Sequence, residues 1–208
     1  MIRVDPQPEP PDFDRDVRQP GCIFLSNNPN PRGRKLPGLW RKALPDLWRI
    51  YDGVCAYSSH WFPLLGGGSV DHFVPKSADP GLAYEWSNYR LSTALLNSRK
   101  GNRQDIVDPF MITGDWFVLV FPALLVKPAA NLPPALFNDV QTTIDALELN
   151  HEVLISIRLG YVLDYCDNDV TLAYLQRRAP FLAHELIRQN LTERIRVMMA
   201  RRSPPPGP

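Results

Sequence analysis

Hydrophobic and polar residues along the chain form patterns that predict a mixed α+β fold. Residues 54–57 and 69–74 are short runs rich in apolar side chains and bounded by Gly, Asp or Pro, which predicts two strands. Residues 92–100 follow, with Ser92 in the N-cap position and Gly101 in the position of a C-terminal stop, which predicts a helix. The expected local order is therefore strand, strand, helix.

The pattern changes in the second half of the chain. Residues 116–121 are almost continuously apolar and predict a further strand. Apolar residues then recur at helical spacing over 134–147, which predicts a helix there. Three more helices are expected, the last continuing to about residue 200, and their starting residues are Asn150, Asp169 and Pro180. We expect residues 111–200 to form a strand plus helical region that supports the first half or docks a partner.

Prolines are concentrated at the two ends of the chain. Seven lie within residues 1–35, which disfavours a continuous helix and predicts an extended arm on the body. A disordered tail is the alternative, although Phe13 and Val17 offer apolar anchors that a tail would not need. Residues 201–208 hold four prolines and are expected to be disordered.

Composition places the chain among folded proteins and excludes a uniformly basic nucleic-acid binder. Its 208 residues are 44% hydrophobic and 22% charged, with a formal net charge of +1. Three scattered cysteines favour reduced thiols, and no secretory signal follows Met1, so we expect a cytoplasmic location. The longest apolar run, 116–126, is shorter than the about 20 residues of a membrane-spanning helix, so no membrane association is expected.

The near-neutral total conceals a basic segment. Residues 32–50 contain six Lys or Arg residues and one acid, and Trp40 and Trp48 lie among them. Basic side chains mixed with aromatic rings suit a phosphate backbone, although a solvated helix face with buried tryptophans gives the same pattern. The candidate nucleic-acid contacts in this segment are Arg34, Lys35, Arg41 and Lys42.

One composite motif carries chemical information. Asp71 and His72 form a pair, Asn88 follows sixteen residues after His72, and residues 97–101 read Asn-Ser-Arg-Lys-Gly. In order, spacing and flanking residues this arrangement resembles the HNH endonucleases, which are built on a ββα-metal finger. The resemblance covers residues 51–110, and it implies that 36–110 form a nuclease finger with a preceding basic helical segment, packed on the helical region.

The residue types match the chemistry of phosphodiester hydrolysis. A neutral imidazole is a suitable base near pH 7, so His72 is the candidate catalytic residue that activates water. Carboxylate and amide oxygens suit one Mg²⁺ or Mn²⁺ ion, and Asp71 and Asn97 supply them, as the equivalent motif positions do in the family. For Asn88 the resemblance implies a structural role in which its amide bonds backbone groups of the active-site loop.

Further polar residues extend the candidate site. Arg99, Lys100 and Arg103 are candidate phosphate-binding residues, and the pattern does not choose among them. His60 is either a second phosphate or metal contact or a surface histidine. Many HNH fingers carry two Cys-x-x-Cys pairs that bind zinc, but here Cys55 has no such partner, so no structural zinc is expected.

Short sequence segments outside the motif extend the resemblance more loosely. Residues 8–14, 86–90, 108–110 and 143–150 look like a group of bacterial HNH proteins, some of which accompany an ATPase in Septu-type or retron anti-phage systems. The resemblance implies a metal-dependent endonuclease acting on DNA, with RNA not excluded, and an ATPase partner on the helical half. The alternative is a catalytically inert HNH-fold subunit that binds nucleic acid or regulates a partner.

Overall fold

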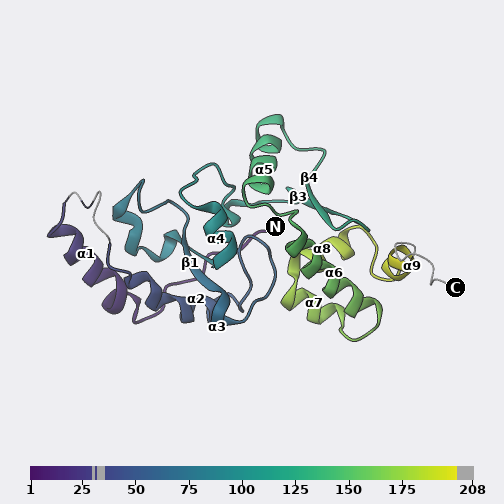
Figure 1. The fold of residues 1–208 in the computed structure, drawn as a ribbon, viewed down its shortest axis with the longest axis horizontal. Helices are drawn as coiled ribbons and strands as arrows, with labels where there is room; N and C mark the ends of the chain where they lie inside the picture. Colours follow the sequence, from purple (N-terminus) through teal and green to yellow (C-terminus); the bar gives the residue numbers. More distant parts are fainter. Residues whose placement is uncertain (30, 32–35, 201–208) are drawn as a thin grey trace.

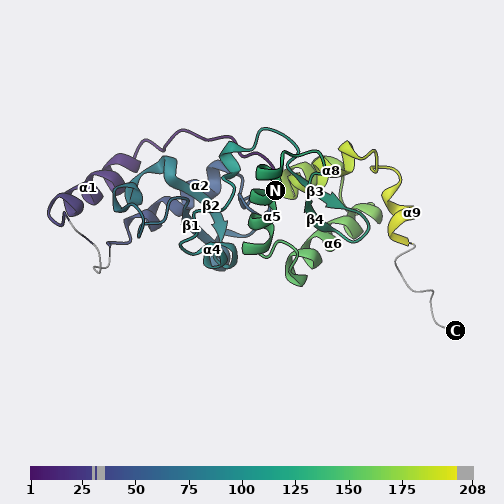
Figure 2. The same ribbon diagram turned by 90° about the horizontal axis from the view of Figure 1, so that it is seen from above.

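The computed structural model describes residues 1–29, 31 and 36–200. The molecule is elongated, with α1 at one end and α9 near the other, and its two halves meet around the middle of the long axis (Figures 1 and 2). The structure combines helices with two small antiparallel sheets, which confirms an α+β fold. Two of the candidate nucleic-acid contacts, Arg34 and Lys35, and the tail 201–208 lie outside the described residues.

The first half is built around one hairpin and the helix that follows it. Strand β1 (Gly68–His72) pairs antiparallel with β2 (Tyr89–Thr93), and α4 (Ala94–Lys100) comes directly after β2. The register places Asp71 opposite Arg90 and His72 opposite Tyr89. Helix α4 packs against both strands, so the order along the chain is strand, strand, helix.

One of the two strands expected in this half is absent, and β1 pairs with residues 89–93. Residues 54–57 do not form a strand but make a single bridge, between Val54 and Trp61. The chain turns back too early for a ladder, because Gly53 and Ser59 both have positive φ angles. Ser92, expected to cap the helix, lies in β2 instead, and the cap is Thr93, whose hydroxyl accepts a hydrogen bond from the Leu96 amide.

The remaining helical elements of this half are short. They are a π-helical turn at Asp14–Arg18, α1 (Gln19–Ser26), a 3₁₀ turn at Leu39–Ala43, α2 (Leu44–Ile50), the irregular turn α3 (Leu64–Gly67), and 3₁₀ turns at Pro80–Tyr84, Trp86–Asn88 and Pro109–Met111. Proline occupies the first turn of α2, where its missing N–H is not needed.

The prediction of an extended backbone through residue 35 is wrong for residues 14–26, which are helical. Pro20 does not prevent this because it lies in the first turn of α1. Phe13 packs edge-on against the Trp86 ring, and Val17 is buried. The segment before Phe13 has no helix or strand, and it also contacts the body, since the Val4 amide donates to the Pro109 carbonyl oxygen.

The second half pairs a small hairpin with a group of helices. Strands β3 (Phe117–Val120) and β4 (Leu125–Pro128) are antiparallel. The helices are α5 (Pro134–Ala146), α6 (Glu152–Cys166), α7 (Leu172–Arg178), α8 (Pro180–Arg188) and α9 (Ile195–Ala200). Among the described residues, no helix is both long enough and apolar enough to cross a membrane.

Three of the expected helix boundaries in this half are wrong. His151 rather than Asn150 caps α6, because the Asn150 amide instead bonds both backbone groups of Val126 and holds β4. Thr171 rather than Asp169 precedes the third helix. The last helix is broken into α8 and α9, with Asn190 in a left-handed conformation between them.

Buried polar bonds join the halves. The Thr143 hydroxyl accepts a hydrogen bond from the Val107 amide, and the Trp61 amide donates to the Arg178 carbonyl oxygen. Within the first half, Arg90 forms a two-pronged ion pair with Asp108 and lies 3.5 Å from the centre of the Phe110 ring. These contacts position the hairpin and α4 against the helical half.

Candidate active site

The candidate site lies where β1 ends. Asp71 and His72 are the last two residues of β1, and they are 1% and 4% exposed. Because neighbouring strand residues point to opposite faces, the two side chains enter different surroundings. Asp71 contacts residues of α4 and the 55–60 loop, whereas His72 lies against the loop between β1 and β2.

His72 is held in one orientation, with Nδ1 as its basic nitrogen. Its Nε2 is 2.9 Å from the Ala83 carbonyl oxygen, which only accepts, so Nε2 carries the proton and Nδ1 is the acceptor. The ring meets those of Trp40 and Tyr89 edge-on, with centroids 5.0 and 5.1 Å away. Burial lowers the pKa of His72 to about 4, and the positive charge of Lys76 acts in the same direction. The imidazole is therefore neutral at pH 7, and the same two causes make Nδ1 a weaker base than in an ordinary histidine.

Asp71 is surrounded by donors beneath the strand. One carboxylate oxygen accepts from the Tyr57 hydroxyl, and the other is 3.2 Å from the Lys100 ammonium. Burial raises the pKa of Asp71, and the positive charge of Lys100 opposes this shift. Lys100 is itself fully buried and also donates to the His72 carbonyl oxygen at 2.9 Å, so a lysine ammonium compensates the carboxylate.

Asn97 lies one turn before Lys100 on α4. Its Nδ2 donates to the Ser69 hydroxyl and is 3.4 Å from the Val70 carbonyl oxygen. This bond orients the amide across β1, toward the strand that carries Asp71. The amide oxygen has no hydrogen-bond partner among the described residues.

Asn88 organises the loop between β1 and β2. Its Oδ1 accepts from the Val74 amide, and its Nδ2 donates to the carbonyl oxygens of Val74 and Leu82. The Asn88 carbonyl oxygen also accepts from the Phe73 amide. One buried amide thus ties the start of this loop to its end, close to His72.

The three candidate phosphate-binding residues have different surroundings. Lys100 is buried beneath the site, as described above. Arg99 turns to the second half, where it pairs with Glu148 at 2.7 Å. Arg103 is exposed and pairs with Asp105, also at 2.7 Å. Only Lys100 contacts Asp71 or His72.

The three remaining candidate contacts lie near different features. Arg41 is exposed and adds positive charge near Lys76, while Lys42 is exposed and approaches the Asp16 carbonyl oxygen. His60 is buried rather than on the surface, 6.0 Å from the Tyr161 ring centre, and neither of its ring nitrogens has a hydrogen-bond partner. Burial lowers the pKa of His60 to about 3, so its ring is neutral.

The structure adds three residues that the sequence argument did not place in the site. Lys76 lies with its ammonium 3.3 Å from His72 Nδ1 and 4.6 Å from the centre of the Trp40 ring. Tyr57 contacts Asp71, as described above. Lys76 stands four residues after His72, beyond Pro75, and that local spacing was the available signal. Tyr57 and Trp40 carry no such signal, because folding brings them there from elsewhere in the chain.

The donor types suit a divalent cation, but the carboxylate is already compensated. Asp71 and Asn97 offer the carboxylate and amide oxygens that Mg²⁺ or Mn²⁺ prefers. Within the described residues, no group of three or more His, Cys, Asp or Glu side chains forms a metal cluster. Each oxygen of Asp71 already has one bonded partner, so a cation at this carboxylate would compete with the positive charge of the Lys100 ammonium.

Comparison with known proteins does not identify a family for this chain. No protein-family model matches the chain, and no curated protein matches it.

Proposed function

We propose that the protein is a metal-dependent endonuclease of the HNH type that hydrolyses phosphodiester bonds of DNA. The observation that carries the proposal is His72, which is neutral, fixed through Nε2 and left with Nδ1 as a base at the end of β1. It is supported by the motif order, with Asp71 beside His72 and Asn97 on the helix that follows the hairpin. A ββα-metal finger spanning β1, β2 and α4 is part of the same proposal.

The protein groups divide the chemistry among them. His72 Nδ1 accepts the proton of the attacking water, while the Ala83 carbonyl oxygen holds the ring in the required tautomer. Lys76 leaves the imidazole and contacts the phosphate, which its half-buried position beside Nδ1 allows. Asn88 keeps the loop that carries both groups in place.

Asp71 and Asn97 would hold one Mg²⁺ or Mn²⁺ ion. Such an ion supplies positive charge that stabilises the phosphate and the leaving oxygen in the transition state. With such an ion bound, Lys100, three residues after Asn97, would have to give up its place beside Asp71. No structural zinc belongs to the proposal.

The looser resemblance suggests a biological role for the proposed activity. We propose an anti-phage role in which an ATPase docks on the helical half and controls cleavage. Exposed Arg41, whose positive charge acts on Lys76, suits a nucleic-acid backbone beside the site. The alternative function is an inert finger that binds nucleic acid or regulates a partner, and the tight Asp71–Lys100 pair is the observation that favours it.

Plasmid nicking tests the proposal. Wild-type protein, His72→Ala and His184→Ala are incubated with supercoiled DNA in Mg²⁺, Mn²⁺ or EDTA, with a folded RNA as a second substrate. His184 is an exposed histidine of α8 that pairs with Asp115, so it is the matched control. We expect metal-dependent nicking by wild type and His184→Ala, and a loss of about 10²-fold or more in His72→Ala.

Two results would overturn the proposal. Equal nicking by wild type and His72→Ala would remove His72 from the chemistry. Binding of DNA without cleavage in either metal, equally in both proteins, would establish the inert alternative.

A further inference from the structure

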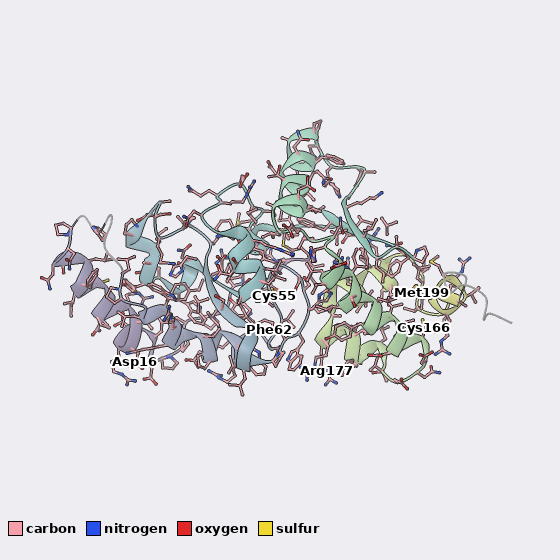
Figure 3. All side chains as sticks on the ribbon, in the orientation of Figure 1. Asp16, Cys55, Phe62, Cys166, Arg177 and Met199 are labelled. Atoms are coloured by element: carbon pink, nitrogen blue, oxygen red, sulfur yellow. The ribbon has the colours of Figure 1, made fainter. Side chains whose placement is uncertain are left out.

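A pocket lies where the halves meet, away from His72. It has a volume of about 690 Å³ and is bordered by α2, by the chain around Asp52 and Trp61, by the end of α7 and by residues 2–4. Arg177, one of its residues, lies at the lower edge of the molecule in Figure 3, on α7. None of the residues that contact His72 or Asp71 lines this pocket.

The pocket is positively charged. Its lining contains four arginines and a single acid, Asp52, and the arginines are Arg3, Arg49, Arg177 and Arg178. Arg3 and Arg49 already pair with acidic residues outside the lining. Within the part of the chain that the structure describes, neither Arg177 nor Arg178 has an acidic partner in ion-pair range. Two neighbouring guanidinium groups are thus available to an anion.

Aromatic side chains also line the pocket. Trp48, Trp61, Tyr51 and Tyr174 all contribute to the lining. The Trp48 ring is fixed by its Nε1, which donates to the Phe62 carbonyl oxygen at 2.9 Å. Trp61 lies edge-on to Trp48, with 6.3 Å between ring centres. The two rings thus form one wall of the pocket, and the Trp48 ring needs no ordering when a planar ligand arrives, because its hydrogen bond already holds it.

The arginine and aromatic residues of the pocket lining contact one another. The Arg178 guanidinium lies 4.1 Å from the centre of the Trp61 ring, and the Arg178 carbonyl oxygen accepts from the Trp61 amide at 2.7 Å. Gly53 allows the close packing behind them, because a Cβ there would lie 2.7 Å from both indole rings. Its φ of +67° is also a conformation that other residues rarely adopt. The positive charge of Arg178 is thereby held over one face of the Trp61 ring.

We propose that this pocket binds a nucleotide, with the base against the Trp48–Trp61 wall and the phosphate groups at Arg177 and Arg178. Guanidinium groups match phosphate oxygens, and indole rings stack on bases. The volume lies within the range of sites that enclose small ligands. The nucleotide is either a free molecule or the phosphorylated end of a single strand, since both present the same chemistry.

Titration calorimetry in EDTA tests the site without depending on phosphodiester hydrolysis. The ligands are ATP, adenosine, inorganic triphosphate and a single-stranded oligonucleotide with or without a 5′-phosphate. We expect ATP to bind more tightly than adenosine or triphosphate, because only ATP uses both the aromatic and the cationic part. If the 5′-phosphorylated oligonucleotide binds more tightly than both ATP and the unphosphorylated oligonucleotide, the site is assigned to a strand end. If ATP binds more tightly than the phosphorylated oligonucleotide, the site is assigned to a free nucleotide.

Variants connect the binding to the named residues. Arg177→Ala/Arg178→Ala is expected to weaken ATP binding about tenfold or more, whereas Arg194→Ala, which removes an exposed arginine outside the pocket, leaves it unchanged. Trp61→Phe keeps a ring and is expected to weaken binding less than the double variant. Thermal unfolding of each variant establishes that it is folded.

Three results would overturn the proposal: no ATP binding at millimolar concentration, equal affinity for ATP and inorganic triphosphate, or unchanged binding in the folded double variant. His72→Ala is expected to bind ATP as wild type does. A negative nicking result therefore does not contradict the nucleotide-binding proposal. A negative ATP-binding result likewise does not contradict the proposed hydrolysis.

Discussion

The Lys100 ammonium lies 3.2 Å from one carboxylate oxygen of Asp71, and both side chains are almost completely removed from solvent. This buried pair joins α4 to β1 at the candidate site. A buried charge without its partner is costly, so the two residues are coupled in stability and in any binding of cations.

Lys100→Met is expected to destabilise the protein by about 3–5 kcal/mol, because it leaves the Asp71 carboxylate buried without a counter-charge. Urea unfolding at pH 7 measures the loss. Asp71→Asn/Lys100→Met removes both charges and is expected to lose less than Lys100→Met alone. Arg103→Met breaks an exposed pair and serves as the control, with an expected loss below about 1 kcal/mol. A double variant less stable than Lys100→Met would contradict the coupling.

Divalent cations and Lys100 are expected to compete for Asp71. In folded Lys100→Met, Mg²⁺ or Mn²⁺ should raise the unfolding temperature more than in wild type, because the carboxylate is free to bind. A concentration of about 100 times Kd adds about 2.7 kcal/mol. Lys100→Met/Asn97→Ala lacks the second proposed ligand and should lose much of this response. An equal response in all three proteins would place the cation elsewhere.

His60 is expected to make the fold sensitive to acid. Its pKa is about 3 in the folded protein, because burial disfavours the charged ring, and about 6.5 in the unfolded chain. Between these values the unfolded chain binds more protons, so stability is full above about pH 6.5 and falls as pH decreases. At pH 5 the loss from this residue is about 2 kcal/mol.

Urea unfolding at pH 7 and pH 5 measures this effect as a difference between proteins. His60→Phe keeps a ring beside Tyr161, and it leaves no donor or acceptor unmatched because neither nitrogen of His60 has a partner. It should lose less stability than wild type on going to pH 5. His184→Phe, at an exposed position, should behave like wild type. An unchanged pH dependence in His60→Phe would show that His60 does not titrate in this way.

Gly21→Ala tests whether the N-terminal helical segment is part of the core. A Cβ at Gly21 would lie 2.2 Å from Cγ of Tyr84, so the helix or the ring must move. We expect a loss of about 1–3 kcal/mol in thermal or urea unfolding. Gly160→Ala is the matched control in α6, where nothing lies within 4 Å, and it should stabilise the protein by about 0.5–1 kcal/mol. Equal stability of Gly21→Ala and wild type would mean that the segment packs more loosely.

The proximity of the motif residues followed in part from their spacing. His72, Asp71 and Lys100 are in contact, and the Asn88 amide bonds the backbone beside them. Spacing along the chain did not indicate which basic residue pairs with Asp71, because the pairing depends on how α4 packs against β1. Arg99, adjacent to Lys100, faces Glu148 instead.

The pairing of β1 shows a second limit of the sequence argument. Residues 54–57 and 89–93 both have apolar side chains suited to a strand, and local pattern does not choose between them. The turns at Gly53 and Ser59 and the long loop held by Asn88 favour β2 as the partner. Such a choice depends on contacts across the hairpin rather than on neighbours in the chain.

Local sequence patterns were enough to predict the α+β class, strand β1, and helices such as α4 and α5. Proline at helix starts, Gly101 at a helix end and apolar spacing act within a few residues. Tertiary structure decided the partner of β1, the helical N-terminal segment, the burial of His60 and the Asp71–Lys100 pair. These depend on residues far apart in sequence, 29 positions in the case of the pair, whose burial and charge compensation exist only once the chain has packed.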